Sequence, residues 1–198
     1  FDKRTKQGKA DYEAFTQENA GRHIVSEDEM QHIIGMRDAV MSHPTAKEFL
    51  YKGESEVTIV WTDAETGIQC KCRPDRIPSD ISDIFVDLKT CESAGKGRFN
   101  SEVINRKYHV RLWMYAEGLG LLTGREHRIL AVIAVEKLPP YQVEVYTLDE
   151  HYAQDGFDKF HEALRVEKQC RETGVWPAYV NAGATDLEAP NWMRKEGR

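Results

Sequence analysis

Apolar residues along the chain recur with two different periods, which divide it into helices and strands. From Met30 to Val40 they return at close to helical spacing behind a Ser26–Glu29 capping box, which predicts a helix ending before Pro44. The predicted helices cover 26–43, 45–51, 102–122 and 149–173, with a short one within 1–25. Runs of β-branched and aromatic residues or strict alternation predict strands over 56–61, 68–77, 84–89, 129–135 and 141–148.

The order of these elements predicts an α/β fold with a mixed central β-sheet flanked by helices. Residues 63–67 form the turn of a predicted hairpin, and the apolar run 84–89 with its charged end suits a central strand. Residues 91–100, with two glycines, are expected to be a loop. A length of 198 residues favours one domain spanning 1–198, and the start on Phe1 instead of Met leads us to expect a missing upstream N-terminal segment.

Composition narrows the classes of protein that remain. A net charge of −6 argues against a protein that binds DNA over its whole surface, although it leaves room for a local basic face. No apolar stretch approaches the roughly 18 residues of a membrane span, so no membrane association is expected. The cysteines at 70, 72, 91 and 170 lack the spacing of a zinc site or an iron–sulfur cluster. Free thiols in a reducing cytoplasm are the expected state.

Three charged residues stand in or beside strands that should be buried. Asp75 ends an Arg-Pro-Asp segment, and after eleven residues Asp87-Leu-Lys89 follows on the next strand. Side chains alternate along a strand, so Asp87 and Lys89 point to one face, and Asp75 can reach them from the preceding antiparallel strand. A solvated ion pair is the simplest alternative. Unpaired charges in a buried strand cost several kcal/mol, however, which favours a functional site.

Two carboxylates and an ammonium group are the groups that hydrolysis of a phosphodiester requires. Aspartate oxygens suit Mg²⁺, which lowers the pKa of a bound water and screens the phosphate charge. Lys89 is assigned the orientation of the attacking water and the stabilisation of the transition state. Asp75, Asp87 and Lys89 are therefore the predicted catalytic centre of a magnesium-dependent nuclease.

The Pro74-Asp75 and Asp87-Leu-Lys89 pattern resembles that of the PD-(D/E)XK nuclease superfamily, and the wider sequence resembles its RecE-type branch, the exonuclease VIII proteins of prophage recombination. The segments that carry the likeness are Phe1–Thr5, Gly8-Lys9, Glu56 ahead of Trp61, Cys70–Ile77, Val86–Thr90, Tyr108–Val110 with Tyr115, Pro140–Val143 and Trp176-Pro177. Together they span nearly the whole chain.

The resemblance implies a restriction-endonuclease-like core and a cytoplasmic 5′→3′ exonuclease acting on the ends of linear double-stranded DNA. It implies Mg²⁺ as cofactor, with Mn²⁺ as a substitute, and 3′ single-stranded tails passed to a single-strand annealing recombinase. It also implies a ring-like homo-oligomer. By the same resemblance Asp75, Asp87 and the carbonyl of Leu88 bind the metal, and Lys89 is the catalytic lysine. An endonuclease on the same fold, or a degenerate domain that only binds DNA or a protein, remains an alternative.

The sequence departs from this family at two places. The upstream metal-binding histidine has no counterpart, since His23, His32 and His43 stand in other contexts, and Arg111 precedes Tyr115 where relatives have Gln-x-x-x-Tyr. Basic residues are densest after the catalytic strand, as expected for a phosphate track or for a solvated face. The predicted DNA-binding residues are Arg73, Arg76, Lys96, Arg98, Lys107, Arg111 and Tyr115, with Arg106 in the same stretch, and Glu56 is a candidate for supporting the site.

Overall fold

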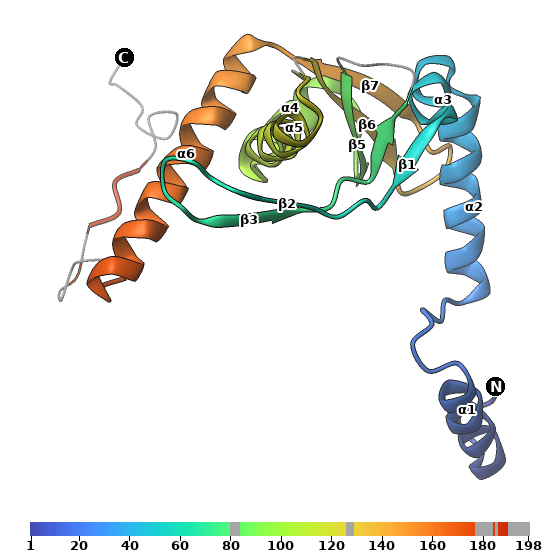
Figure 1. Ribbon diagram of the computed structural model, residues 1–198. Helices are drawn as coiled ribbons and strands as arrows, with labels where there is room; N and C mark the ends of the chain where they lie inside the picture. Colours follow the sequence, from blue (N-terminus) through green and yellow to red (C-terminus); the bar gives the residue numbers. More distant parts are fainter. Residues whose placement is uncertain (80–83, 126–128, 177–183, 185, 190–198) are drawn as a thin grey trace, which may run out of the picture.

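The computed structural model describes residues 1–79, 84–125, 129–176, 184 and 186–189. Its centre is a mixed five-stranded sheet of order β1-β4-β5-β6-β7 (Figure 1). The strands are β1 (Gly53–Ser55), β4 (Arg76–Pro78), β5 (Ile84–Cys91), β6 (Ile129–Glu136) and β7 (Val143–Leu148). The helices are α1 (Lys6–Glu18), α2 (Glu27–Ser42), α3 (Pro44–Tyr51), α4 (Lys96–Asn105), α5 (Tyr108–Thr123) and α6 (Glu150–Thr173). This arrangement confirms the predicted α/β fold.

The sheet is covered by helices on both faces. Along β6 the even-numbered residues 130, 132 and 134 pack into one apolar core with α4, α5 and α6, and the odd-numbered residues 131, 133 and 135 pack into a second core with α2 and α3. A strand buried on both sides has no polar face, which explains the uninterrupted apolar run in this segment. β5 pairs with β6 in parallel, with Asp87 opposite Val132, so β5 is also an inner strand.

The predicted hairpin is present, but it does not belong to the main sheet. β2 (Ile59–Thr62) and β3 (Gln69–Cys72) form a separate two-stranded sheet, which reaches beneath α5 toward α6 (Figure 1). The prediction of a strand from Glu56 was wrong, because Glu56 has a φ of 58° and interrupts the extended backbone. The second predicted strand, 68–77, is likewise divided into β3 and β4.

The hairpin is held against α5 by a close contact. Trp61 of β2 packs over Gly118, where a Cβ atom would lie 2.6 Å from the indole ring. A glycine is therefore needed at this position for the two elements to approach, although glycine inside a helix is intrinsically unfavourable.

The predicted helix over 102–122 is divided into two helices, and the predicted loop over 91–100 is shorter than expected. β5 continues to Cys91, and α4 begins at Lys96. α4 and α5 are separate helices, because Lys107 adopts the left-handed conformation with a φ of 56° and turns the chain between them. Tyr108, the first residue of α5, is buried after this turn, so the apolar face of α4 does not continue into α5.

Side-chain caps and a glycine mark the ends of two helices. Ser26 and Glu29 form the predicted capping box of α2, and Asp149 caps α6, which stops at Gly174 in a left-handed conformation. The four cysteines are free thiols. Among the described residues, no helix is both long and apolar enough to cross a lipid bilayer.

Candidate active site

Asp87 and Lys89 lie on β5 in the middle of the main sheet. Both face the layer formed by α4 and α5, as strand alternation predicts. The Asp87 side chain is only 2% exposed, and its Oδ2 forms an ion pair with Lys89 Nζ. Lys89 also donates a hydrogen bond to the carbonyl of Leu88 (3.2 Å). The ammonium group thus links the buried carboxylate to a backbone oxygen at the surface.

Asp75 joins this pair from the segment that precedes β4. The backbone N–H of Leu88 donates to Asp75 Oδ2 at 3.2 Å, and Lys89 Nζ lies 3.8 Å from the same oxygen. β4 pairs with β5 through Arg76 and Val86, which brings the residue just before β4 alongside β5. The structure therefore brings together the three groups that the sequence analysis placed at one site.

Burial governs the protonation of Asp87. Loss of solvent is the main reason that the pKa of Asp87 rises from 3.8 to about 6. The nearby Lys89 ammonium opposes this rise, and the Asp75 carboxylate adds a smaller contribution in the same direction as burial. A buried carboxylate held near its point of protonation is poorly compensated by its protein neighbours alone. A cation beside it would favour the ionised form.

The oxygen atoms around Asp87 fit a hard divalent cation. Asp87 Oδ2 is buried and makes no hydrogen bond of acceptable geometry despite its contact with Lys89. The second carboxylate, Asp75, and the Leu88 carbonyl lie on the same side, and all three donors are oxygens of the kind that Mg²⁺ prefers. Of the histidines considered for this site, His32 contacts the hydroxyl of Tyr141 and His43 caps α3.

A basic groove of about 510 Å³ lies between β3 and the start of α5. It is lined by Lys71, Cys72, Arg73, Arg106, Lys107, Val110, Arg111, Met114 and Tyr115. Tyr115 connects the groove to the catalytic strand, because its ring packs against that of Phe85 on β5, two residues before Asp87, with ring centres 5.7 Å apart. Lys89 Nζ lies 5.5 Å from the centre of the Tyr108 ring, so α5 covers the site directly.

The groove contains four of the predicted DNA-binding residues: Arg73, Lys107, Arg111 and Tyr115. Arg111 and Tyr115 share one face of α5, as their spacing predicts. Lys71 also lines the groove but was missed. Its alternation with the buried Cys70 and Cys72 on β3 was the available signal, since alternation requires Lys71 to face outward.

Other candidates lie outside the groove. Lys96 borders a different pocket, between α4 and β7, and Arg98 pairs with Glu92 at 2.6 Å. Arg76 donates to Ser55 and lines a small cavity of about 270 Å³ that also contains Asp75 and Leu88.

Glu56 does not contact the catalytic carboxylates. It forms a 2.8 Å ion pair with Arg73 Nε, and both side chains are more than half exposed. The strand that was expected to start at Glu56 begins only at Ile59, as β2, so Glu56 is not part of a strand. Its assignment as site support is therefore corrected to an ion pair at the rim of the groove.

We expect Asp87→Asn to stabilise the metal-free protein at pH 8 by about 1–3 kcal/mol. Since the folded-state pKa of Asp87 lies above 3.8, folding takes up a proton between about pH 4 and 6, and wild-type stability falls as the pH rises through this interval. The gain from the substitution should therefore shrink as the pH falls from 6 to 4. Urea unfolding at several pH values measures the difference in free energy of unfolding between variant and wild type, with Glu144→Gln on β7 as the exposed control. A gain that does not change with pH would contradict the assignment.

Comparison with known proteins gives a family. The model for a "PDDEXK-like domain of unknown function (DUF3799)" matches residues 2–188. The crystal structure of a "putative exonuclease" from Eubacterium rectale is similar over 90% of this chain and 70% of that chain, with a TM-score of 0.64 and 15% identity. The crystal structure of SSO0001 aligns over 78% and 70% with a TM-score of only 0.37 and 16% identity. No curated protein matches. The fold agrees with the matched family, and the chain belongs to the PDDEXK-like domains of DUF3799.

Proposed function

We propose that this protein is a metal-dependent exodeoxyribonuclease that degrades linear double-stranded DNA. The observation that carries the proposal is the convergence of Asp75, Asp87 and Lys89 at β5, an inner strand of the sheet. A PDDEXK-like fold around these groups supports hydrolysis of a phosphodiester. The name of the similar Eubacterium rectale structure supports an exonuclease over other nucleases.

Each residue of the centre has a role that follows from its position. Asp75, Asp87 and the Leu88 carbonyl would hold Mg²⁺, or Mn²⁺ in its place. The bound ion would lower the pKa of a coordinated water and neutralise charge on the phosphate. The Lys89 ammonium, which has three donors, already contacts Asp87 and the Leu88 carbonyl. It can orient the attacking water and stabilise the negative charge that develops on phosphorus oxygens.

The basic groove gives the substrate a path to this centre. Its arginine and lysine side chains can neutralise successive phosphates, and Tyr115, which also lines the groove, packs against Phe85 on the catalytic strand β5. Such a local basic surface is compatible with a net charge of −6. The groove therefore supports DNA as the polymer that is cleaved.

The finer properties come from the sequence resemblance to the exonuclease VIII proteins. These are 5′→3′ polarity, the production of 3′ single-stranded tails for recombination, a partner annealing protein and a ring-like homo-oligomer in the cytoplasm. We propose them together with the exonuclease activity.

Asp87→Asn should reduce Mg²⁺-dependent degradation of linear DNA by at least about 10²-fold, because it removes the buried anion that holds the metal.

Lys89→Ala should lower kcat by about 10²-fold and change the Mg²⁺ concentration for half-maximal rate far less. Rates at saturating DNA over a Mg²⁺ titration measure both effects. Glu144→Gln and Lys137→Ala are matched exposed controls. Full activity of Asp87→Asn would remove the basis of the proposal.

An exonuclease requires a DNA end. We therefore expect the wild-type protein to degrade linear duplex DNA and to leave a covalently closed circle of the same sequence intact. Gel electrophoresis with end-labelled and internally labelled substrates distinguishes the outcomes. Cleavage of the closed circle at a comparable rate would favour an endonuclease on the same fold.

The groove should contribute to affinity for DNA through phosphate contacts. In the Asp87→Asn background, which prevents cleavage, Arg111→Ala should weaken binding and reduce the slope of log K against log salt by about 1. The control is Arg171→Ala on α6, where Arg171 pairs with Glu167. Fluorescence anisotropy at several salt concentrations measures both variants. Equal losses for the two arginines would show that the groove is not the DNA path.

A further inference from the structure

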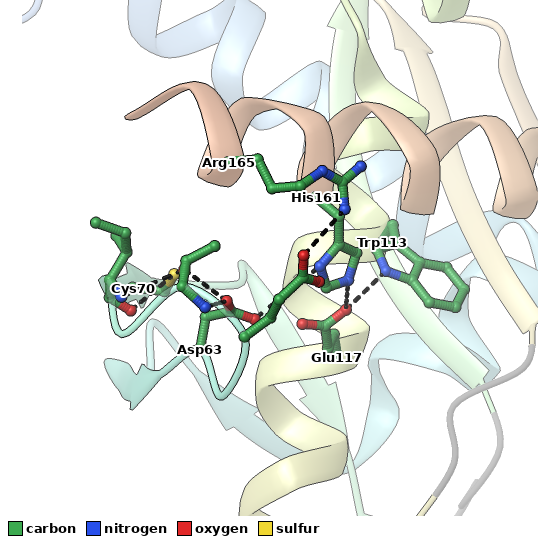
Figure 2. Close-up of polar contacts among 9 residues, drawn as sticks. Asp63, Cys70, Trp113, Glu117, His161 and Arg165 are labelled. Carbon is green, nitrogen blue, oxygen red and sulfur yellow. Dashed lines mark hydrogen bonds and ion pairs between the residues drawn. The ribbon is translucent and has the colours of Figure 1, made fainter. Parts of the chain in front are cut away.

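A second cluster of metal-ligating side chains lies at the tip of the β2–β3 hairpin. Asp63 comes from the turn of the hairpin, Glu117 from α5 and His161 from α6 (Figure 2). One donor atom of each residue lies within 4.8 Å of those of the other two. None of the three lines the basic groove or contacts Asp75 or Asp87, so this cluster is separate from the catalytic centre.

Asp63 is buried, and Glu117 and His161 are partly buried. The exposed fractions are 7% for Asp63, 18% for Glu117 and 13% for His161. Two carboxylates thus share one imidazole in a place with little water. The nearby Arg165 pairs with Glu65 at 3.5 Å (Figure 2). Removing two carboxylates from water is costly unless they are paired, and a bound cation or a proton is a common partner for them.

The hydrogen bonds leave a gap that faces the imidazole. Glu117 Oε2 lies 2.9 Å from His161 Nε2 and accepts a hydrogen bond from Trp113 Nε1 at 2.9 Å. Thr66 donates twice to Asp63 Oδ2, through its backbone N–H and its hydroxyl, so Asp63 Oδ1 is the oxygen that faces His161. Oδ1 and His161 Nδ1 are 4.0 Å apart, which is too far for a hydrogen bond.

The imidazole lies between the two carboxylates, with Nε2 toward Glu117 and Nδ1 toward Asp63. A cation bound by all three side chains would take the place of the proton that the imidazole shares with Glu117 in the metal-free protein.

We propose that Asp63, Glu117 and His161 form a zinc site that fastens the β2–β3 hairpin to α5 and α6. One imidazole and two carboxylates are a donor set that Zn²⁺ accepts, with water in the fourth position. Tetrahedral Zn²⁺, with bonds of about 2.0–2.2 Å, keeps its ligand atoms about 3.4 Å apart. The donor atoms already lie within 4.8 Å, so small side-chain movements would complete the site.

The three ligands come from segments far apart in the chain, so a bound ion would cross-link them in the folded state and stabilise it.

The test measures zinc binding in the Asp87→Asn full-length chain, where the catalytic metal site is disabled. After treatment with chelator and reloading with Zn²⁺, elemental analysis should find one ion per chain, and the melting temperature should rise with Zn²⁺ and not with Mg²⁺. Adding His161→Ala or Asp63→Asn should weaken Zn²⁺ binding at least tenfold by calorimetry. Asparagine can keep an oxygen for Thr66 and so preserves the hairpin turn.

His151→Ala is the matched control, because His151 lies exposed on the same helix. It should bind Zn²⁺ as the parent does, and circular dichroism should show that all variants are folded. Absence of bound zinc in the parent, or unchanged affinity in the Asp63→Asn variant, would overturn the proposal and identify the cluster as an imidazolium shared by two carboxylates. The result is independent of nuclease activity.

Discussion

A carboxylate buried in the middle of the sheet is the constraint on which the active site depends. Asp87 occupies a position on β5 that an apolar residue would otherwise fill, and its pKa rises to about 6 as a consequence. Lys89, two residues further along the same face, supplies the compensating charge. The sheet holds both groups rigidly, because β5 pairs along its whole length with β6, which is buried on both faces. The unfavourable burial thus becomes a fixed site with affinity for a cation.

The rest of the site is assembled by interruptions in regular structure. The chain leaves extended geometry at Glu56 and again between β3 and β4, which separates the hairpin from the main sheet. This break allows Asp75 to accept a hydrogen bond from the backbone of Leu88. A second interruption, at Lys107, turns α5 so that its first residues cover Lys89 and line the basic groove.

The β2–β3 hairpin connects the two sites that we propose. Lys71 on β3 lines the basic groove, whereas Asp63 at the tip belongs to the cluster with Glu117 and His161 (Figures 1 and 2). Trp61 packs on Gly118 between them, so the hairpin and α5 behave as one packed unit. An ion at the tip would hold the hairpin in the position that shapes the groove. The catalytic centre and the second cluster would then be coupled through packing, without sharing a ligand.

The sequence by itself determined the α/β architecture, the capped start of α2, the doubly buried strand β6 and the common face of Asp87 and Lys89. Each of these follows from local periodicity, because the spacing of apolar residues along the chain shows which side chains face the core. Tertiary structure decided that Glu56 leaves the strand and pairs with Arg73, that α4 and α5 are separate, and that the hairpin forms its own sheet. It also brought together Asp63, Glu117 and His161. Periodicity carries no information on which distant segments pack together, because that choice depends on the shape and charge of the partner surfaces.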